Sequence, residues 1–254
     1  MCDLRLFEAE SGTIDTLAVD GFQSHAHDEF PNKRECSMTI ELYVFPPSPR
    51  AFKVMALANH LGLDVTIRMI DLIKGEQKTP QYAALNPNMR MPTCKDGDYV
   101  LWESEAILQY LAGRKPQSGL LPQDERGRLD VTRWQFWDLH HWDPHCAVFI
   151  FENILKPIVL KIGEPDQAAL AKGAELFHRS AAVLDGQLKG KPWVTGDKLT
   201  VADFSLGAPL NYAEMARLPL EPYGEIRRWF AALSALPAWQ KTRGETALSR
   251  AAAA

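Results

Sequence analysis

Ser48 stands at the start of a predicted helix, where a hydroxyl can do chemistry. Pro49 follows it, and apolar residues then recur with helical spacing: Val54, Leu57, Ala58 and Leu61. A serine at a helix N-terminus can donate a hydrogen bond to an anionic atom, and the helix dipole adds partial positive charge there. The same position is typical of a serine that only caps a helix, so both interpretations stand at this point.

Three histidines and two aspartates lie close together and invite a metal-binding interpretation: His140, His141, His145, Asp138 and Asp143. We expect no metal site, because Pro144 should break or kink the helix between His141 and His145 and no further ligand completes the set. Trp134, Trp137 and His141 recur at i, i+3 and i+7. They therefore share a helix face that packs in the core or lines an apolar pocket.

The composition limits the partners of the chain. With 254 residues, 46% of them hydrophobic, the chain is long enough for one large or two ordinary domains. A net charge of −4 gives no basic field for nucleic acid or an anionic membrane, so we expect neither partner. The four cysteines match no metal-binding spacing: Cys2, Cys36, Cys94 and Cys146. Free thiols are typical of a reducing compartment, so we expect a cytoplasmic protein.

Residues 1–37 differ from the rest, with eight acidic and three basic side chains. This acidic composition, without the basic start and apolar stretch of an export signal, predicts a poorly ordered N-terminal extension. Alternatively, it is upstream sequence translated from a misassigned start, since Met38 directly precedes the first convincing strand. Deleting the extension should then leave folding and ligand affinity unchanged.

The first half of the remaining chain has an α/β pattern. Residues 40–45 form an apolar, β-rich run, and the helix after Ser48 ends at Gly62. Residues 65–70 alternate as a second strand, which a βαβ crossover makes parallel to the first. A short helix is expected at residues 81–85. Residues 92–95 and 99–102 flank an Asp-Gly-Asp turn and predict a hairpin, followed by a helix that Ser104 is placed to cap.

Helical patterns dominate from about Asp124 onward, so a small α/β domain precedes an all-helical one, with the boundary near residues 116–122. Within this second half, Thr200 and Asp203 have the spacing of a capping box, and Leu199 and Phe204 that of a hydrophobic staple. We interpret that segment as structural.

Several motifs, in this order and spacing, resemble the cytosolic glutathione S-transferase family: SPRAFKV, KGEQKTP, NPNMRMP, DGDYVLWES and GDKLTVADF. The resemblance covers residues 38–248 and is closest to bacterial, phi- or theta-like enzymes of the serine type. It implies a thioredoxin-like domain over 38–115 (βαβαββα, with a mixed four-stranded sheet), which binds glutathione. An all-helical bundle over 123–254 would hold the electrophile. It also implies glutathione as co-substrate, no metal, and a homodimer.

The resemblance assigns the sulfur of glutathione to Ser48, whose hydroxyl would favour the thiolate. Members commonly carry an arginine four residues after this serine. Here Phe52 occupies that position, and the arginine of the loop is Arg50. Arg50 could therefore share or take over the orientation of the sulfur. No cysteine occurs in this loop, which disfavours thiol exchange through a protein cysteine, and no tyrosine occurs there either.

The other glutathione contacts are also implied by resemblance: Gln77, Lys78, Arg90, Met91, Pro92, Glu103 and Ser104. Met91, before a cis proline, would pair its main chain with the cysteinyl unit. Glu103 and Ser104 would hold the γ-glutamyl ammonium and carboxylate, and Lys78 would face the glycyl carboxylate. Trp134, Trp137 and His141 would line the electrophile pocket.

The leading function is therefore a transferase that conjugates the glutathione thiolate to an apolar electrophile. Other glutathione-dependent reactions on this scaffold remain open, namely peroxide reduction, isomerisation and dehalogenation. An alternative of another class is a glutathione-binding or regulatory protein without turnover.

Overall fold

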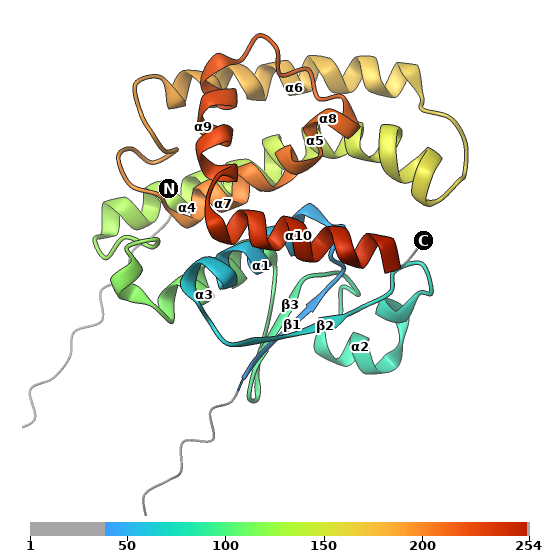
Figure 1. Ribbon diagram of the computed structural model, residues 1–254, viewed down its shortest axis with the longest axis vertical. Coiled ribbons are helices and arrows are strands. Elements are labelled where there is room, and N and C mark those ends of the chain that lie inside the picture. The colour runs from blue at the N-terminus through green and yellow to red at the C-terminus, as the bar shows by residue number, and fades with distance from the viewer. Residues whose placement is uncertain (1–38, 253–254) are drawn as a thin grey trace, which may run out of the picture. The chain divides into compact units, whose positions relative to one another are not determined.

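The computed structural model describes residues 39–252, with side chains up to residue 246, and the predicted N-terminal extension lies outside this range. The first half of the described chain contains four strands and three α-helices (Figure 1): β1 (Ile40–Val44), α1 (Pro49–Leu61), β2 (Val65–Met69), α2 (Pro80–Leu85), β3 (Thr93–Asp96), β4 (Tyr99–Trp102) and α3 (Ser104–Gly113). A 3-10 turn, η1 (Glu76–Lys78), precedes α2. This order is the predicted βαβαββα.

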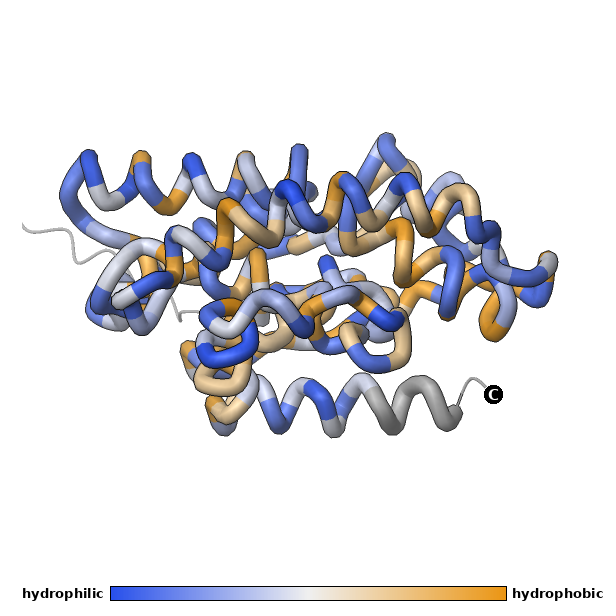
Figure 2. The backbone as a smooth tube through the Cα atoms, turned by 90° about the horizontal axis from the view of Figure 1, so that it is seen from above, coloured by the Kyte–Doolittle hydropathy of each residue, from blue (hydrophilic) through white to orange (hydrophobic). Residues whose placement is uncertain are grey.

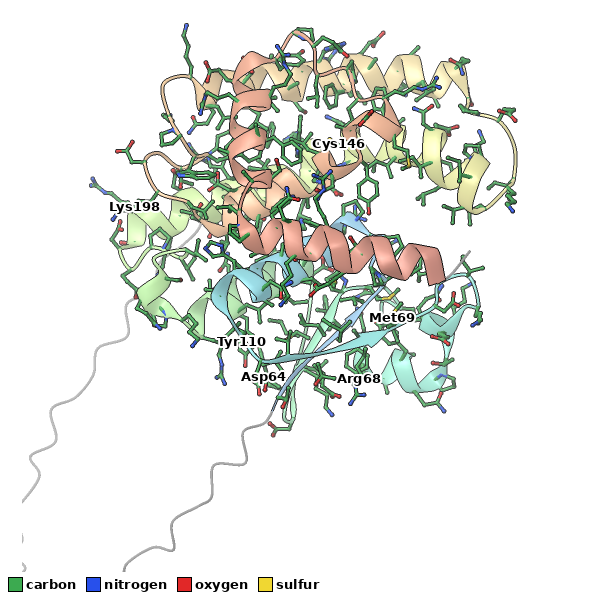
Figure 3. All side chains as sticks on the ribbon, in the orientation of Figure 1. Asp64, Arg68, Met69, Tyr110, Cys146 and Lys198 are labelled. Atoms are coloured by element: carbon green, nitrogen blue, oxygen red, sulfur yellow. The ribbon has the colours of Figure 1, made fainter. Side chains whose placement is uncertain are left out.

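The four strands form one mixed sheet in the order β2-β1-β3-β4. β1 is parallel to β2 and antiparallel to β3, which pairs with β4 as the predicted hairpin. At the edge strand β2, Arg68 binds Glu41 of β1 with an Nε to Oε1 distance of 2.8 Å (Figure 3). Ile40, Leu42 and Val44 are buried, whereas the alternate residue Tyr43 contacts the ring of Tyr82 in α2. One face of β1 is therefore buried in the core, and α2 contacts the opposite face at Tyr43.

The second half is helical, as expected. Its helices are α4 (Glu125–Trp137), α5 (Asp143–Ile150), α6 (Gln167–Leu188), α7 (Val201–Gly207), α8 (Ala213–Ala216), α9 (Gly224–Ser234) and α10 (Pro237–Ala252). Short 3-10 segments η2 (Pro116–Ser118) and η5 (Ala208–Tyr212) precede α4 and α8. Hydrophobic and hydrophilic residues alternate along these helices (Figure 2), as in helices with one face in a core. No helix in the described part of the chain is long and apolar enough to span a membrane.

The predicted capping box is confirmed at the start of α7. Asp203 Oδ2 accepts the main-chain N–H of Thr200 at 2.9 Å, and the Thr200 side chain caps in return. The other oxygen, Oδ1, accepts the N–H of Val194 and the indole N–H of Trp229, both at 2.9 Å. This one carboxylate therefore ties α7 to the preceding loop and to α9.

Both cysteines that the structure describes are packing residues of the core. Cys94 and Cys146 are buried and unbonded, and Cys146 lies among the helices of the second half (Figure 3). Burial raises the pKa of Cys94 to about 12 and the pKa of Cys146 well above its ordinary value, which disfavours the nucleophilic thiolate at both positions.

Two local predictions are wrong. Ser104 is the first residue of α3 rather than its N-cap, which is Glu103. Pro144 does not break the helix: α4 continues through a π turn, η3 (Asp138–Trp142), directly into α5. Pro144 lies in the first turn of α5, where the wider π turn takes up the loss of one N–H donor. A second π segment, η4 (Phe151–Val159), extends α5 and contains Pro157.

Candidate functional site

Ser48 is the N-cap of α1, with extended backbone angles (φ −77°, ψ 131°). Its main chain closes the loop, since the N–H donates to Phe45 and the C=O accepts from Phe52. Its hydroxyl makes no capping hydrogen bond, and the residue is half-buried. The hydroxyl is therefore available to a ligand at the start of a thirteen-residue helix.

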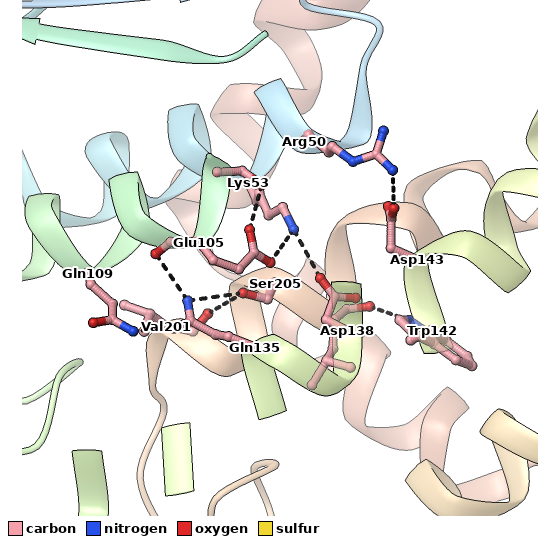
Figure 4. Close-up of polar contacts among 12 residues, drawn as sticks. Arg50, Lys53, Glu105, Gln109, Gln135, Asp138, Trp142, Asp143, Val201 and Ser205 are labelled. Carbon is pink, nitrogen blue, oxygen red and sulfur yellow. Dashed lines mark hydrogen bonds and ion pairs between the residues drawn. The ribbon is translucent and has the colours of Figure 1, made fainter. Parts of the chain in front are cut away.

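Arg50 is in the first turn of α1, and its guanidinium forms an ion pair with the carboxylate of Asp143 in α5 (Figure 4). The loop before α1 has a second contact with the helical half, because the Tyr212 hydroxyl donates to the carbonyl of Pro47. The turn that carries Ser48 is thus held by residues from two helical elements.

Three of the predicted glutathione-contact segments meet at one edge of the sheet. Ser48 follows the C-terminal end of β1, where Tyr43 pairs with Thr93 at the start of β3. Thr93 pairs in turn with Trp102 at the end of β4. The Ser48 loop, the Met91-Pro92 segment and the start of α3 therefore lie side by side.

The peptide bond between Met91 and Pro92 is cis. Met91 is partly exposed, and the preceding carbonyl of Arg90 accepts hydrogen bonds from Tyr82 (2.7 Å) and Asn86 (2.8 Å). The Arg90 side chain is exposed. These bonds fix the backbone of the segment from α2.

Glu103 is exposed and has a positive φ of 72°, which is uncommon for a residue other than glycine. Such a conformation is kept where the surrounding structure requires it, often at a binding site. Ser104 beside it is buried, and its hydroxyl donates to Glu105. Ser104 is thus oriented by its neighbour before any ligand is present.

Gln77 and Lys78 belong to η1, on the connection that leaves the same end of the sheet after β2. Lys78 is exposed. Gln77 is half-buried, and its side-chain oxygen is shielded from water without a hydrogen-bond partner among the described residues. Among residues 39–246, no hydrogen bond or ion pair joins Gln77 or Lys78 to Ser48 or Glu103, so the strand order is what places them at this end of the sheet.

The face predicted for an apolar pocket has a graded exposure. Trp134 is buried and packs edge-on against Trp137, with ring centroids 5.2 Å apart. Trp137 is half-buried and lies 5.9 Å from the ring of His141, which is exposed. Trp134 therefore belongs to the core, and only Trp137 and His141 reach the surface.

A buried ionic cluster lies behind this edge and was missed by sequence reasoning (Figure 4). Lys53 Nζ contacts Glu105 at 2.6 Å and Asp138 at 3.0 Å. Burial alone would lower the pKa of Lys53, but the charges of Asp138, Glu105 and Asp143 outweigh it and raise that pKa. The only sequence signal was a lysine inside the otherwise apolar run AFKVMALA.

The pKa values of the two carboxyl groups in this cluster are shifted in opposite directions. Burial, together with the nearby charges of Glu105 and Asp143, raises the pKa of Asp138 well above its ordinary value. Burial also opposes the ionisation of Glu105, but Lys53 and the surrounding hydrogen bonds lower its pKa overall. Of the two carboxyl groups, Asp138 is therefore the one whose environment favours the protonated form more strongly.

Among residues 39–246, no group of three or more metal-ligating side chains is placed to hold an ion. A cavity of about 420 Å³ lies elsewhere, between α1, β2 and α10, and none of the predicted site residues lines it.

The comparisons with known proteins agree with this architecture. Two family models match the chain, described as "Glutathione S-transferase, N-terminal domain" over residues 38–113 and "Glutathione S-transferase, C-terminal domain" over residues 141–237. Glutathione S-transferase 3 of Zea mays is 34% identical over 210 residues, which are 80% of this chain and 92% of the relative. Glutathione S-transferase D7 of Drosophila melanogaster is 29% identical over 206 residues, covering 80% and 88%.

A solved structure is also similar. The glutathione transferase URE2P6 from Phanerochaete chrysosporium, in complex with oxidized glutathione, superposes with a TM-score of 0.73 at 26% identity. The match covers 83% of this chain and 97% of that one.

Proposed function

Because the chain belongs to the glutathione S-transferase family, we propose that it conjugates the thiolate of glutathione to an apolar electrophile. The observation that carries the proposal is the hydroxyl of Ser48, which makes no capping hydrogen bond. It lies at the sheet edge where the Met91-Pro92 and Glu103-Ser104 segments meet. Ser48 makes this an enzyme of the serine type. The bacterial source suggested by the sequence stays a prediction.

In the proposed complex, glutathione extends along this edge. The main chain of Met91 pairs with the cysteinyl unit, Glu103 holds the γ-glutamyl ammonium, and Ser104 binds its carboxylate. Lys78 faces the glycyl carboxylate. Gln77, next to Lys78, and Arg90, next to Met91, are secondary candidates for the same contact. These contacts place the sulfur near Ser48.

The chemical step needs a thiolate, since a thiol is a poor nucleophile. The Ser48 hydroxyl donates a hydrogen bond to the sulfur and the N-terminus of α1 adds partial positive charge, while the thiol proton leaves to solvent. Lowering the thiol pKa by about two units requires roughly 2.7 kcal/mol of preferential stabilisation of the thiolate. The sulfur then attacks the electrophilic carbon, forming the S–C bond as the leaving group departs with its electron pair.

The proposal assigns residues 38–115 to glutathione and residues 123–254 to the electrophile, with Trp137 and His141 lining its pocket and Trp134 supporting them from the core. We further propose that the protein is a cytoplasmic homodimer without a metal cofactor. Exposed apolar side chains on α4 support the dimer, and the unbonded thiols of Cys94 and Cys146 support a reducing compartment.

The test is an ultraviolet titration of bound glutathione at about 240 nm in the protein, Ser48→Ala and Arg50→Ala. The proposal expects thiolate well below the ordinary thiol pKa of about 8.5, with the shift abolished by Ser48→Ala. Ser234→Ala, at a serine whose hydroxyl only bonds Ala231 in α9, is the matched control. Binding without any pKa shift would instead support a binding or regulatory protein. A shift lost only in Arg50→Ala would assign the sulfur to Arg50.

A further inference from the structure

Two aspartates bracket the π turn between α4 and α5, and both contact α1. Asp138 opens the turn and pairs with Lys53, whereas Asp143 follows the turn and pairs with Arg50. Arg50 and Lys53 are three residues apart and so share one face of α1. The two ion pairs together join this face to the helix that carries Trp137 and His141 (Figure 4).

The π turn is what gives both aspartates access to α1. In a regular α-helix, residues five apart point about 140° away from each other, at 3.6 residues per turn. Here the N–H of Asp143 donates to the carbonyl of Asp138, five residues back, and this wider turn brings the directions of the two side chains closer together. Trp142 within the turn is fully buried, and its indole N–H donates to the Leu206 carbonyl at 2.8 Å. The turn is therefore fixed by the core.

The Arg50–Asp143 pair is asymmetric. The Asp143 side chain is 6% exposed, whereas that of Arg50 is 46% exposed. A buried carboxylate needs a partner, so Asp143 holds Arg50 more firmly than an exposed acid would. A guanidinium on the surface would otherwise sample many rotamers.

The free hydroxyl of Ser48 makes such an anchor necessary. The first turn of a helix frays when its N–H groups lack caps, and the Ser48 side chain caps none of them. Side-chain contacts that hold this turn to the helical half include Arg50 to Asp143 and Tyr212 to the Pro47 carbonyl. The first turn of α1 is therefore held by contacts with other helical elements, in place of a hydrogen bond from a capping hydroxyl.

We propose that Asp143 is a positioning residue for Ser48. By holding Arg50, it fixes the first turn of α1 and keeps the uncapped Ser48 hydroxyl directed at the sulfur of glutathione. This inference rests on the proposed function, and Asp143 acts through Arg50 without touching the substrate. The ionisable groups around Asp143 are Arg50 and Lys53 of α1, Glu105 of α3, Asp138 of the π turn and Cys146 of α5.

The test measures the pKa of the bound glutathione thiol in Asp143→Asn by the titration described above. Positioning predicts a rise of about one unit, a tenfold loss of thiolate at pH values below the pKa. It also predicts that kcat recovers at high pH while KM for glutathione changes little. If Asp143 acted only through its charge, Asp143→Asn would lower the pKa of the thiol, because removal of the negative charge favours the nearby thiolate. A pKa that stays unchanged or falls overturns the proposal.

Two further variants keep the test decisive. Arg50→Met with Asp143→Leu removes both charges, leaves no unpaired buried acid, and conserves net charge. It should raise the thiol pKa as Asp143→Asn does, and an unshifted pKa in this variant contradicts positioning even if Asp143→Asn fails to fold. Glu225→Gln, which breaks the exposed Glu225–Arg228 pair, is the control and should leave the pKa unchanged. If unmodified protein binds glutathione without forming thiolate, the proposed function itself fails.

Discussion

Lys53 holds a positive charge where its side chain is only 1% exposed, between Glu105 and Asp138. Replacing one member of a buried ion pair leaves the other without compensation, at a cost of about 3–5 kcal/mol. We therefore expect Lys53→Met to lower the free energy of unfolding by that amount, measured by urea denaturation. Arg133→Met, in the exposed Asp130–Arg133 pair, should cost less than about 1 kcal/mol.

The raised pKa of Asp138 allows a second test of the same cluster. If Lys53 and Glu105 are the only charged members at neutral pH, the double variant Lys53→Met/Glu105→Leu removes a complete pair and should regain most of the loss. A double variant as unstable as Lys53→Met would show that Asp138 is ionised, contrary to the pKa shift that burial imposes on it.

Single residues also mark the limit of sequence reasoning at the site. The Ser48 position followed from the Ser-Pro start of a helix, but whether its hydroxyl is used as a cap depends on the local backbone. The sequence gives no local signal for the role of Glu105, since its partners Lys53 and Asp138 are 52 and 33 positions away in the sequence. Pattern reasoning detects neighbours in one element and misses ion pairs formed between elements.

At the scale of elements, the capping box of α7 is a local signal that the structure confirms. Asp203 uses both oxygens as acceptors, so Asp203→Asn would place an amide NH₂ against the N–H groups of Thr200 or of Val194 and Trp229. Leaving such buried groups unsatisfied costs about 1–3 kcal/mol. We expect that loss of stability in thermal or urea unfolding.

Asp166, the N-cap of α6, provides the matched control. Only its Oδ1 accepts, from Ala168 and Ala169, and the residue is on the surface. Asparagine is as good an N-cap as aspartate, so Asp166→Asn should change stability by less than about 0.5 kcal/mol. Equal losses in the two variants would show that Asp203 acts only as a cap, without its links to α9.

The strands and most helix boundaries were predictable for a similar reason. Gly62 ends α1 with φ 59°, the left-handed conformation that glycine favours, and the Asp-Gly-Asp turn joins β3 to β4. The π turn was not predictable, because the sequence shows only a proline where a kink is expected. The π turn forms in place of the kink, and it is held by the buried Trp142 and by the pairs that Asp138 and Asp143 make with α1.

At the scale of the whole molecule, α4 carries an apolar surface that the fold of one chain leaves uncovered. Leu129 and Phe136 are seven residues apart, hence on one face of the helix, and are 60% and 62% exposed. We expect this face to be part of the proposed homodimer interface, since large apolar side chains gathered on a surface mark contacts with partners.

Introducing two carboxylates there should dissociate the dimer, because each would be buried without a partner when two copies associate. We expect Leu129→Glu/Phe136→Glu to sediment as a monomer at a concentration where the unmodified protein is dimeric. The variant should keep its far-ultraviolet circular dichroism, since neither side chain is in the core. Val183→Glu, at an exposed apolar position of α6, is the control and should remain a dimer. A double variant that still sediments as a dimer would place the interface on another surface, and a monomeric unmodified protein would exclude the dimer itself.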